Sequence, residues 1–272
     1  MNNTFNIQRF GLLLKRQWLE FGKIYLITLG VALGIIVTTY TLCLWSVFTS
    51  VRAIQLHNLN FREPLFLIFG LLFLTIIAST YFAHLGQKSR AIIDLMIPAS
   101  TFEKFLAGIL FTSVLATASY LVIFGLVDFA FIAKLRSVVA EKQSLETIVN
   151  SRGEEFKLID ELGYLFAKYN PNDMITSYVL PFFVTSVFLL GSVYFNKFHY
   201  IKTAISVMIF SGLWTYIVIN ISEYLMRNKV PVSSNEFNNN GAFVDYWATL
   251  LFTALTLIFW AITYVRLKEK EV

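Results

Sequence analysis

The sequence predicts an all-α, polytopic membrane protein with six transmembrane helices and an interfacial amphipathic helix at its N-terminus. Only 14% of its 272 residues are charged and 57% are hydrophobic, whereas soluble domains carry about 25% charged residues. The apolar residues gather in continuous blocks of about 20 residues, the length at which a helix crosses a hydrocarbon core of about 30 Å. Basic residues concentrate on alternate connections between these blocks, as in membrane proteins of fixed orientation.

The first expected element is an amphipathic helix at residues 6–22. Its apolar residues recur at three- and four-residue spacing, and most of its charged residues fall between them. This pattern predicts a basic helix lying in the membrane interface. A plain cytoplasmic extension of the first span is the alternative. The apolar residues are Phe10, Leu13, Leu14, Trp18 and Phe21, and the charged ones are Arg9, Lys15, Arg16 and Glu20.

Six apolar segments predict the transmembrane helices. A helix satisfies its own backbone polar groups, which hydrocarbon requires, and the runs are too long and too continuous for the alternating strands of a membrane barrel. No long linker interrupts the chain, so residues 1–272 are expected to form a single transmembrane domain. The expected spans are residues 24–48, 64–84, 105–133, 174–195, 202–221 and 247–265.

The placement of Lys and Arg predicts that both termini are cytoplasmic. With that orientation the inside segments are strongly basic, while basic and acidic residues nearly balance outside. The abundance of Asn, Lys, Ile and Phe is typical of bacteria with AT-rich codons, so the expected location is the bacterial cytoplasmic (inner) membrane. The inside basic residues are Arg9, Lys15, Arg16, Lys23, Lys88, Arg90, Lys104, Lys197, Lys202, Arg266, Lys268 and Lys270.

The inside connection at residues 85–104 is expected to form a rigid block at the membrane surface. Residues 90–97 can form two turns of helix, and Pro98 ends them because proline disfavours the helical conformation in the residue before it. Ser100 and Glu103 then match a capping box, in which each side chain binds the backbone N–H of the other residue. The third span is therefore expected to begin abruptly.

The two longer outside connections have different expected structures. The outer loop at residues 134–173 has apolar residues at spacings that predict two amphipathic helices around Gly153. The stretch at residues 222–246 is polar and rich in Asn, and is expected to be mostly irregular.

No catalytic motif is present in the sequence. It has no phosphate-binding loop, no G-x-S-x-G, no H-E-x-x-H and no C-x-x-C. Cys43 is the single cysteine and the three histidines are isolated, so neither a disulfide nor a metal site is expected. The net charge of +5 lies on one side of the membrane and does not indicate a nucleic-acid partner. We therefore expect neither an enzyme nor a cofactor bound by this chain.

Asp128 is the candidate intramembrane polar site, because it is the one acidic residue within the expected spans. It lies near the outer end of span three. Its side chain is expected either to hydrogen-bond to a neighbouring helix or to face an outward vestibule. Pro181 falls inside span four and is expected to kink that helix.

The order of these elements resembles the membrane (permease) subunits of type-2 ABC exporters. In that family a basic interfacial helix leads into span one, a short inside helix follows span two, and an "LP-x-S-x-x-E-x" stretch leads into span three. Here the sequence LMIPASTFEKFLAGIL carries it, with Ile97 in place of the usual Leu and Pro98, Ser100 and Glu103 at the matching positions. The outer loop between spans three and four departs from the commonest layout, in which the larger outer element lies between spans five and six.

The resemblance implies that the inside loop is a coupling loop that docks on a separate ABC ATPase subunit. That subunit would bind ATP and Mg, and a second permease subunit, identical or different, would complete a central pathway for export of an unidentified substrate. The matching contact residues in this sequence are Gly86, Gln87, Lys88, Ser89, Arg90, Asp94 and Pro98.

A second hypothesis is a non-transporting membrane interaction, immunity or assembly protein that uses its outer loop as the working surface. An intramembrane enzyme would need paired polar catalytic groups at one depth, and the sequence offers no such pair.

Overall fold

The computed structural model describes residues 5–49, 59–86, 96–142, 147–149, 155–157, 162–168, 175–226 and 241–271. The chain divides into two compact units. Unit 1 comprises Met1–Phe21, Leu74–Ala116 and Asn172–Val272, and unit 2 comprises Gly22–Phe73 and Thr117–Pro171. Each unit is described by itself below.

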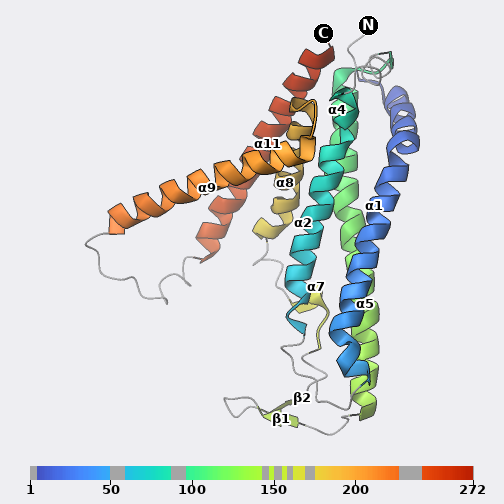
Figure 1. The fold of residues 1–272 in the computed structure, drawn as a ribbon, viewed down its shortest axis with the longest axis vertical. Coiled ribbons are helices and arrows are strands. Elements are labelled where there is room, and N and C mark those ends of the chain that lie inside the picture. The colour runs from blue at the N-terminus through green and yellow to red at the C-terminus, as the bar shows by residue number, and fades with distance from the viewer. Residues whose placement is uncertain are drawn as a thin grey trace. The chain divides into compact units, whose positions relative to one another are not determined.

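Long helices make up most of the described chain (Figure 1). A π-helical segment, η3, joins α4 to α5, so that the three form one helical stretch. The long helices are α1 (Ile7–Thr49), α2 (Arg62–Tyr81), α4 (Thr101–Ile109), η3 (Leu110–Leu115), α5 (Ala116–Lys142), α8 (Ile175–Tyr194), α9 (His199–Met226) and α11 (Gly241–Glu271). The short elements are η2 (Ala83–Gly86), β1 (Thr147–Val149), β2 (Glu155–Lys157) and α7 (Leu165–Lys168).

Five helical stretches of the described chain are long and apolar enough to cross a membrane, which confirms the prediction of a helical, multi-pass membrane protein. They lie on α1, on α2, on the stretch from α4 to α5, on α9 and on α11. The apolar helix α8 is the candidate for a sixth crossing, and the number six stays a prediction.

Two predicted boundaries differ from those in the structure. The expected amphipathic helix and the first span form one helix of 43 residues, α1. The helix expected at residues 105–133 begins at Thr101 and continues to Lys142, so residues 134–142 of the predicted outer loop are helical.

The prediction of two amphipathic helices in the outer loop is wrong at residues 147–149 and 155–157, which form the strands β1 and β2. β1 and β2 form an antiparallel pair in which Ile148 lies opposite Phe156. Thr147, Ile148 and Val149 are all β-branched and therefore favour a strand. The predicted irregular stretch at residues 222–246 is also helical at both ends, since α9 continues to Met226 and α11 begins at Gly241.

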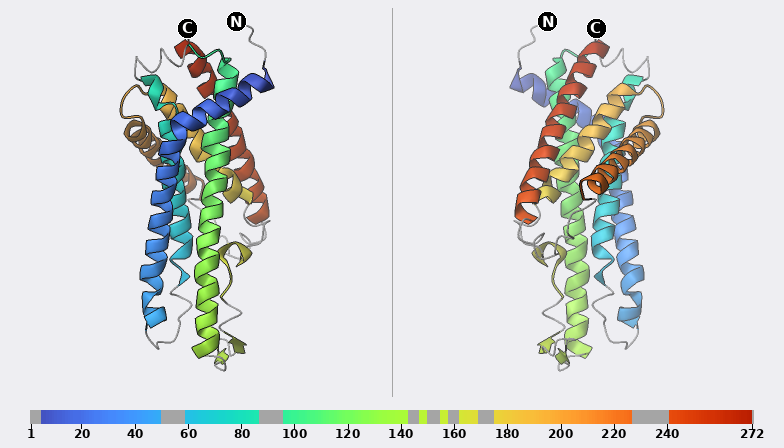
Figure 2. Two further views of the ribbon diagram at one scale, coloured as in Figure 1. Left: turned by 90° about the vertical axis from the view of Figure 1, so that its right-hand side faces the viewer. Right: turned by 90° about the vertical axis from the view of Figure 1, so that its left-hand side faces the viewer.

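In unit 1, α8 and α11 lie side by side (Figures 1 and 2). The ring of Phe183 on α8 packs against the rings of Phe252 and Phe259 on α11, with centroids 5.2 and 6.0 Å apart. α9 diverges from this pair after its first turns (Figure 1). Of the α9 residues from His199 to Tyr224, only Thr203 is buried.

An aromatic cluster fills unit 2 between α2, α5 and α7. The Phe66 ring on α2 lies 4.9 Å from that of Phe124 and 5.5 Å from that of Phe166. The Tyr120 hydroxyl donates to the Phe66 carbonyl oxygen at 2.9 Å. The contacts of Phe166 hold α7, in the outer loop, against α2 and α5.

Candidate functional site

The start of α4 is the first site that the sequence singled out, and the predicted capping box is present. Ser100 adopts an extended conformation, with φ −73° and ψ 152°, and is the N-cap residue. The backbone N–H of Glu103 donates to the Ser100 hydroxyl at 3.3 Å, and the backbone N–H of Ser100 donates to the Glu103 carboxylate at 2.9 Å. α4 therefore begins abruptly after Pro98, as expected.

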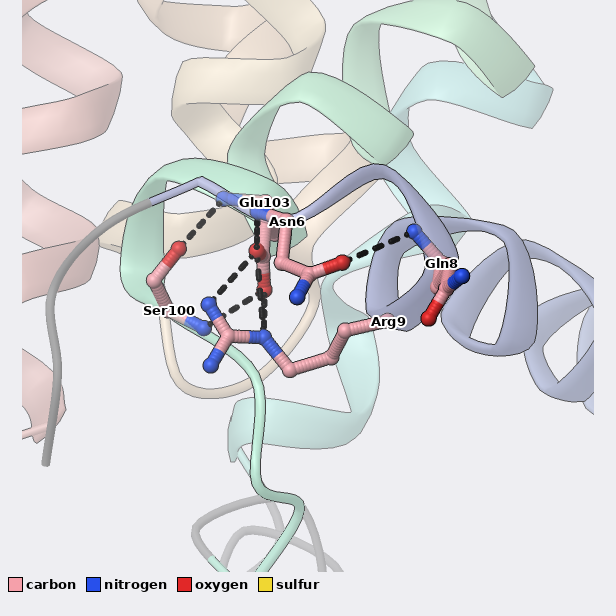
Figure 3. A network of polar contacts seen from close by, with 5 residues as sticks. All are labelled: Asn6, Gln8, Arg9, Ser100 and Glu103. Carbon is pink, nitrogen blue, oxygen red and sulfur yellow. Dashed lines mark hydrogen bonds and ion pairs between the residues drawn. The ribbon is translucent and has the colours of Figure 1, made fainter.

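The Glu103 carboxylate also binds the first turn of α1 (Figure 3). The Arg9 guanidinium donates from Nη2 to Oε1 at 2.7 Å and from Nε to Oε2 at 2.9 Å. The backbone N–H of Asn6 donates to Oε1 at 3.0 Å. Glu103 is fully buried, so these donors replace the water that a buried carboxylate loses. We call Asn6, Arg9, Ser100 and Glu103 the Glu103 network.

The Glu103 network has an apolar counterpart beside it. Leu13 of α1 packs against Ala99 and Ala107 in a buried cluster that Phe10, Leu14 and Ile97 flank. Residues 97–99 are the last residues of the predicted coupling loop before α4. The exit of that loop is therefore held to α1 by polar and by apolar contacts.

Part of the apolar face of residues 6–22 packs on protein, and the position of this helix in the membrane interface stays a prediction. Leu13 and Phe21 are 4% and 9% exposed. The Trp18 ring stacks on Phe111 with centroids 6.2 Å apart, and Phe21 meets Tyr81 edge-on at 5.2 Å. The sequence pattern therefore identified the side of the helix on which these residues pack.

Only the two ends of the predicted coupling loop fall among the described residues. Gln87, Lys88, Ser89, Arg90 and Asp94 lie outside them.

At its first end, Gly86 closes η2 against the carbonyl oxygen of Asn196 and the His199 ring. A Cβ at residue 86 would overlap that carbonyl oxygen, so the close approach requires glycine. At the other end, Pro98 and Met96 are exposed.

Asp128, the candidate polar site, forms a second buried network in unit 2. Arg62 binds its carboxylate from Nε at 2.8 Å and from Nη2 at 2.7 Å. The Tyr40 hydroxyl donates at 2.7 Å and the backbone N–H of Leu165 at 2.9 Å. The Arg62 and Asp128 side chains are 6% and 2% exposed. We call Tyr40, Arg62, Asp128 and the backbone of residues 163–165 the Asp128 network.

The Asp128 network connects three long helices to the outer loop. Tyr40 lies on α1, Arg62 begins α2 and Asp128 lies on α5. Arg62 also donates from Nη1 to the Gly163 carbonyl oxygen at 3.0 Å. Of the two expected environments, hydrogen bonding to neighbouring helices is the one found. These hydrogen bonds hold residues 162–168 in a fixed position on the three helices.

Sequence reasoning missed both arginines and Tyr40. Arg9 lies 94 residues from Glu103, and Arg62 lies 66 residues from Asp128. No spacing rule connects residues so far apart. The one available signal was that a carboxylate in an apolar helix needs a cationic partner, and Arg62 is the nearest arginine to the outer end of the second span.

The described part of the chain contains no cluster of side chains that could hold a metal ion. No group of three or more His, Cys, Asp or Glu side chains is placed there to hold a metal ion. The Nδ1 atom of His84 lies 3.0 Å from the Tyr81 carbonyl oxygen. Cys43 is a free, exposed thiol.

Comparison with known proteins identifies no relative of this chain. No protein-family model, no curated protein and no solved structure matches the chain.

Proposed function

We propose that the chain is the membrane subunit of an ABC-type exporter, which couples ATP hydrolysis by a separate ATPase subunit to outward movement of a substrate. The chain crosses the bacterial inner membrane six times with both termini in the cytoplasm. A second permease subunit, identical or different, completes the pathway. ATP and Mg bind to the ATPase partner, and this chain has no catalytic centre of its own.

The Glu103 network is the observation that carries the proposal. A loop that receives force from a soluble partner must pass that force to the spans. Here the exit of the predicted coupling loop enters α4 through a capping box, and the same carboxylate binds Arg9 of α1 and the backbone of Asn6, which immediately precedes α1. A bidentate arginine–carboxylate pair fixes orientation as well as distance.

The proposed movement follows from these connections. Closure of the ATPase subunits displaces residues 86–98, and the first turns of α1 and α4 move together because Glu103 binds both. The next segment of the same helical stretch is η3, which is π-helical. Such segments interrupt regular helix geometry and frequently occur at functional sites. The stretch can therefore bend at residues 110–115 while its cytoplasmic end stays rigid.

The outer-loop hypothesis is the second candidate function, and the Asp128 network favours it. Arg62 and Asp128 both bind the backbone of residues 163–165, so that part of the outer loop has a fixed place on its unit. A fixed outer element suits a protein whose working surface faces outward. This hypothesis predicts that deletion of residues 140–165 abolishes function and that changes in the inside loop are silent.

The test uses charge reversal in the coupling loop. The chain is extracted gently from its native cells, and the ABC ATPase subunit that co-purifies with it is measured together with export. Asp94→Arg and Arg90→Glu should each lower both, while Lys268→Glu, at an exposed position of α11, should lower neither. Normal co-purification and export in both loop variants, with loss of function on deleting residues 140–165, would reject the exporter in favour of the outer-loop hypothesis.

A further inference from the structure

The side of α1 that faces away from protein carries a short stripe of leucine and basic residues. Leu12 and Leu19 are 71% and 74% exposed. Lys15 is exposed and Arg16 is 35% exposed. Positions i, i+3, i+4 and i+7 share one face of a helix, so Leu12, Lys15, Arg16 and Leu19 form one surface. We call these four residues the Leu–Lys stripe.

Packing within the protein does not explain the Leu–Lys stripe. Leu13 and Phe21 supply the buried side of the same helix, and Gln17 accepts a hydrogen bond from the Tyr81 hydroxyl there. Among the described residues, Arg16 forms an ion pair with its neighbour on the helix, Glu20, at 3.1 Å, and the two side chains are 35% and 63% exposed. An exposed pair of this kind contributes little to stability.

The first part of α1 runs in a different direction from the apolar helical stretch that begins with α4. Residues 7–21 cross α4 obliquely, whereas α4 begins a helical stretch long and apolar enough to span the membrane (Figure 2). A segment that crosses such a helix is inclined to the membrane normal, so its outer side can meet the membrane interface. α1 itself also continues into apolar, membrane-spanning sequence.

We propose that the Leu–Lys stripe is a binding surface for acidic phospholipids, in which Leu12 and Leu19 enter the headgroup–acyl boundary and Lys15 and Arg16 bind headgroup phosphates. An interfacial helix needs apolar area and electrostatic attraction together, because either alone binds weakly. Two leucines supply the apolar area and two cations the attraction. The guanidinium of Arg16 can exchange its exposed pairing with Glu20 for a phosphate, which it binds through two hydrogen bonds. This inference does not depend on what the chain transports.

Quenching by lipids tests the proposal on the full chain. A fluorophore is attached at Gln8→Cys in a Cys43→Ser background, because Gln8 is exposed one turn before Leu12 on the same face. The protein is reconstituted in vesicles that contain either brominated phosphatidylglycerol or brominated phosphatidylcholine at equal density. We expect quenching by both lipids and stronger quenching by the acidic one. High salt should reduce the preference, since exposed charges are screened.

Charge removal gives the second arm of the test. Lys15→Gln and Arg16→Gln should each lower the preference for phosphatidylglycerol by up to about fivefold, the effect of one basic residue near an anionic surface. Lys268→Gln makes the same change in net charge on α11 and should leave the preference at residue 8 unchanged.

Three results would overturn the proposal. Absence of quenching by either lipid would show that protein or solvent covers the stripe. Equal quenching by both lipids would show an interfacial helix without headgroup selectivity. A preference that survives Lys15→Gln combined with Arg16→Gln would place the acidic-lipid site elsewhere.

Discussion

Glu103 and Asp128 are two buried carboxylates, and each is held by an arginine from a distant part of the chain. Burying a charge is unfavourable, so a buried pair is weak evidence of net stabilisation. Loss of one partner is nevertheless costly, because the remaining charge stays in an apolar setting without compensation. We therefore infer that both pairs fix the relative positions of helices, and that removal of either carboxylate destabilises the protein.

Glu103→Gln should destabilise the protein by about 1.5–3 kcal/mol, the range for hydrogen bonds to charged groups. The amide keeps one acceptor but loses the charge that binds Arg9, whose side chain is 31% exposed and so recovers part of its hydration. Thermal unfolding in a neutral detergent measures the loss. Glu269→Gln removes one partner of a pair with exposures of 48% and 54% and serves as the control. Equal melting temperatures for the two variants would contradict the role given to Glu103.

Asp128→Asn should destabilise the protein more than Glu103→Gln does, by about 3–5 kcal/mol, because Arg62 is almost fully buried and cannot regain water.

Tyr40→Phe removes one hydrogen bond to the same Asp128 carboxylate and should destabilise the protein by about 1.5–3 kcal/mol. Tyr25→Phe is its matched control on α1, since Tyr25 is also buried but bonds to the neutral Ser119 hydroxyl. That loss should be about 1 kcal/mol. A Tyr25→Phe loss as large as that of Tyr40→Phe would show that the charge of Asp128 does not strengthen its hydrogen bond with Tyr40.

The sequence predicted local contacts at residue scale and missed distant ones. Ser100 and Glu103 lie three residues apart, so the capping box follows from a spacing rule. The pairing of Asp128 with Tyr40 spans 88 residues and that of Glu103 with Arg9 spans 94. Such pairs depend on which helices become neighbours, and the periodicity of one segment carries no information about that.

At the scale of elements, the sequence predicted the spans well and the outer loop poorly. A long apolar segment has one stable conformation in lipid, the helix, because its backbone polar groups must form hydrogen bonds within the segment. A short stretch such as Thr147–Val149 obeys no such constraint, and its apolar spacing fits either a helix or a strand. The strand forms because a partner, Glu155–Lys157, lies opposite.

The assignment of faces on α1 can be tested with two adjacent leucines. Leu13→Ala should destabilise the protein by about 2–5 kcal/mol, since it leaves a cavity where a side chain only 4% exposed packs against Ala99 and Ala107. Leu12→Ala removes the same atoms from a side chain that is 71% exposed and should change stability by less than about 0.5 kcal/mol. Thermal unfolding of both variants in detergent checks the difference. The reverse order would mean that the buried side of α1 is assigned wrongly.

The junction of α8 and α9 depends on a close contact between Gly191 and Thr203. A Cβ at residue 191 would overlap the Thr203 side chain, so Gly191→Ala should cost about 1–3 kcal/mol through overpacking. Gly212→Ala lies in α9 with no atom within 4 Å of the added Cβ. That control should be neutral or stabilising by up to about 1 kcal/mol, because alanine favours helix over glycine. Adding Thr203→Gly to Gly191→Ala should restore part of the loss, and a failure to do so would point to another cause.

At the scale of the whole molecule, hydropathy indicates what lipid can cover but not which helices pack together. α9 shows this most clearly, because it is as apolar as the other spans although nearly all of its described side chains are exposed. A water-soluble protein could not leave such a helix uncovered, whereas a bilayer can cover it. For this reason the class of the protein was predictable from the sequence and the packing of its helices was not.

The number of crossings decides on which side of the membrane the C-terminus lies, and this makes α8 the decisive helix. Its 20 residues would extend about 30 Å, the thickness of the hydrocarbon core. If α8 crosses, six spans place Gln8 and Lys268 on the same side of the membrane. If α8 does not cross, five spans place them on opposite sides.

Labelling of single cysteines with a membrane-impermeant maleimide distinguishes these outcomes. In a Cys43→Ser background, Gln8→Cys and Lys268→Cys should both react in inside-out vesicles and stay protected in intact cells. Lys134→Cys, an exposed position on α5 just after the third span expected from the sequence, should show the opposite behaviour and confirms that the vesicles are sealed. Reaction of Gln8→Cys and Lys268→Cys from opposite sides would remove α8 from the set of spans. The proposed exporter would fail with it, because a coupling loop and a C-terminus on opposite faces do not fit the six-span arrangement on which that function depends.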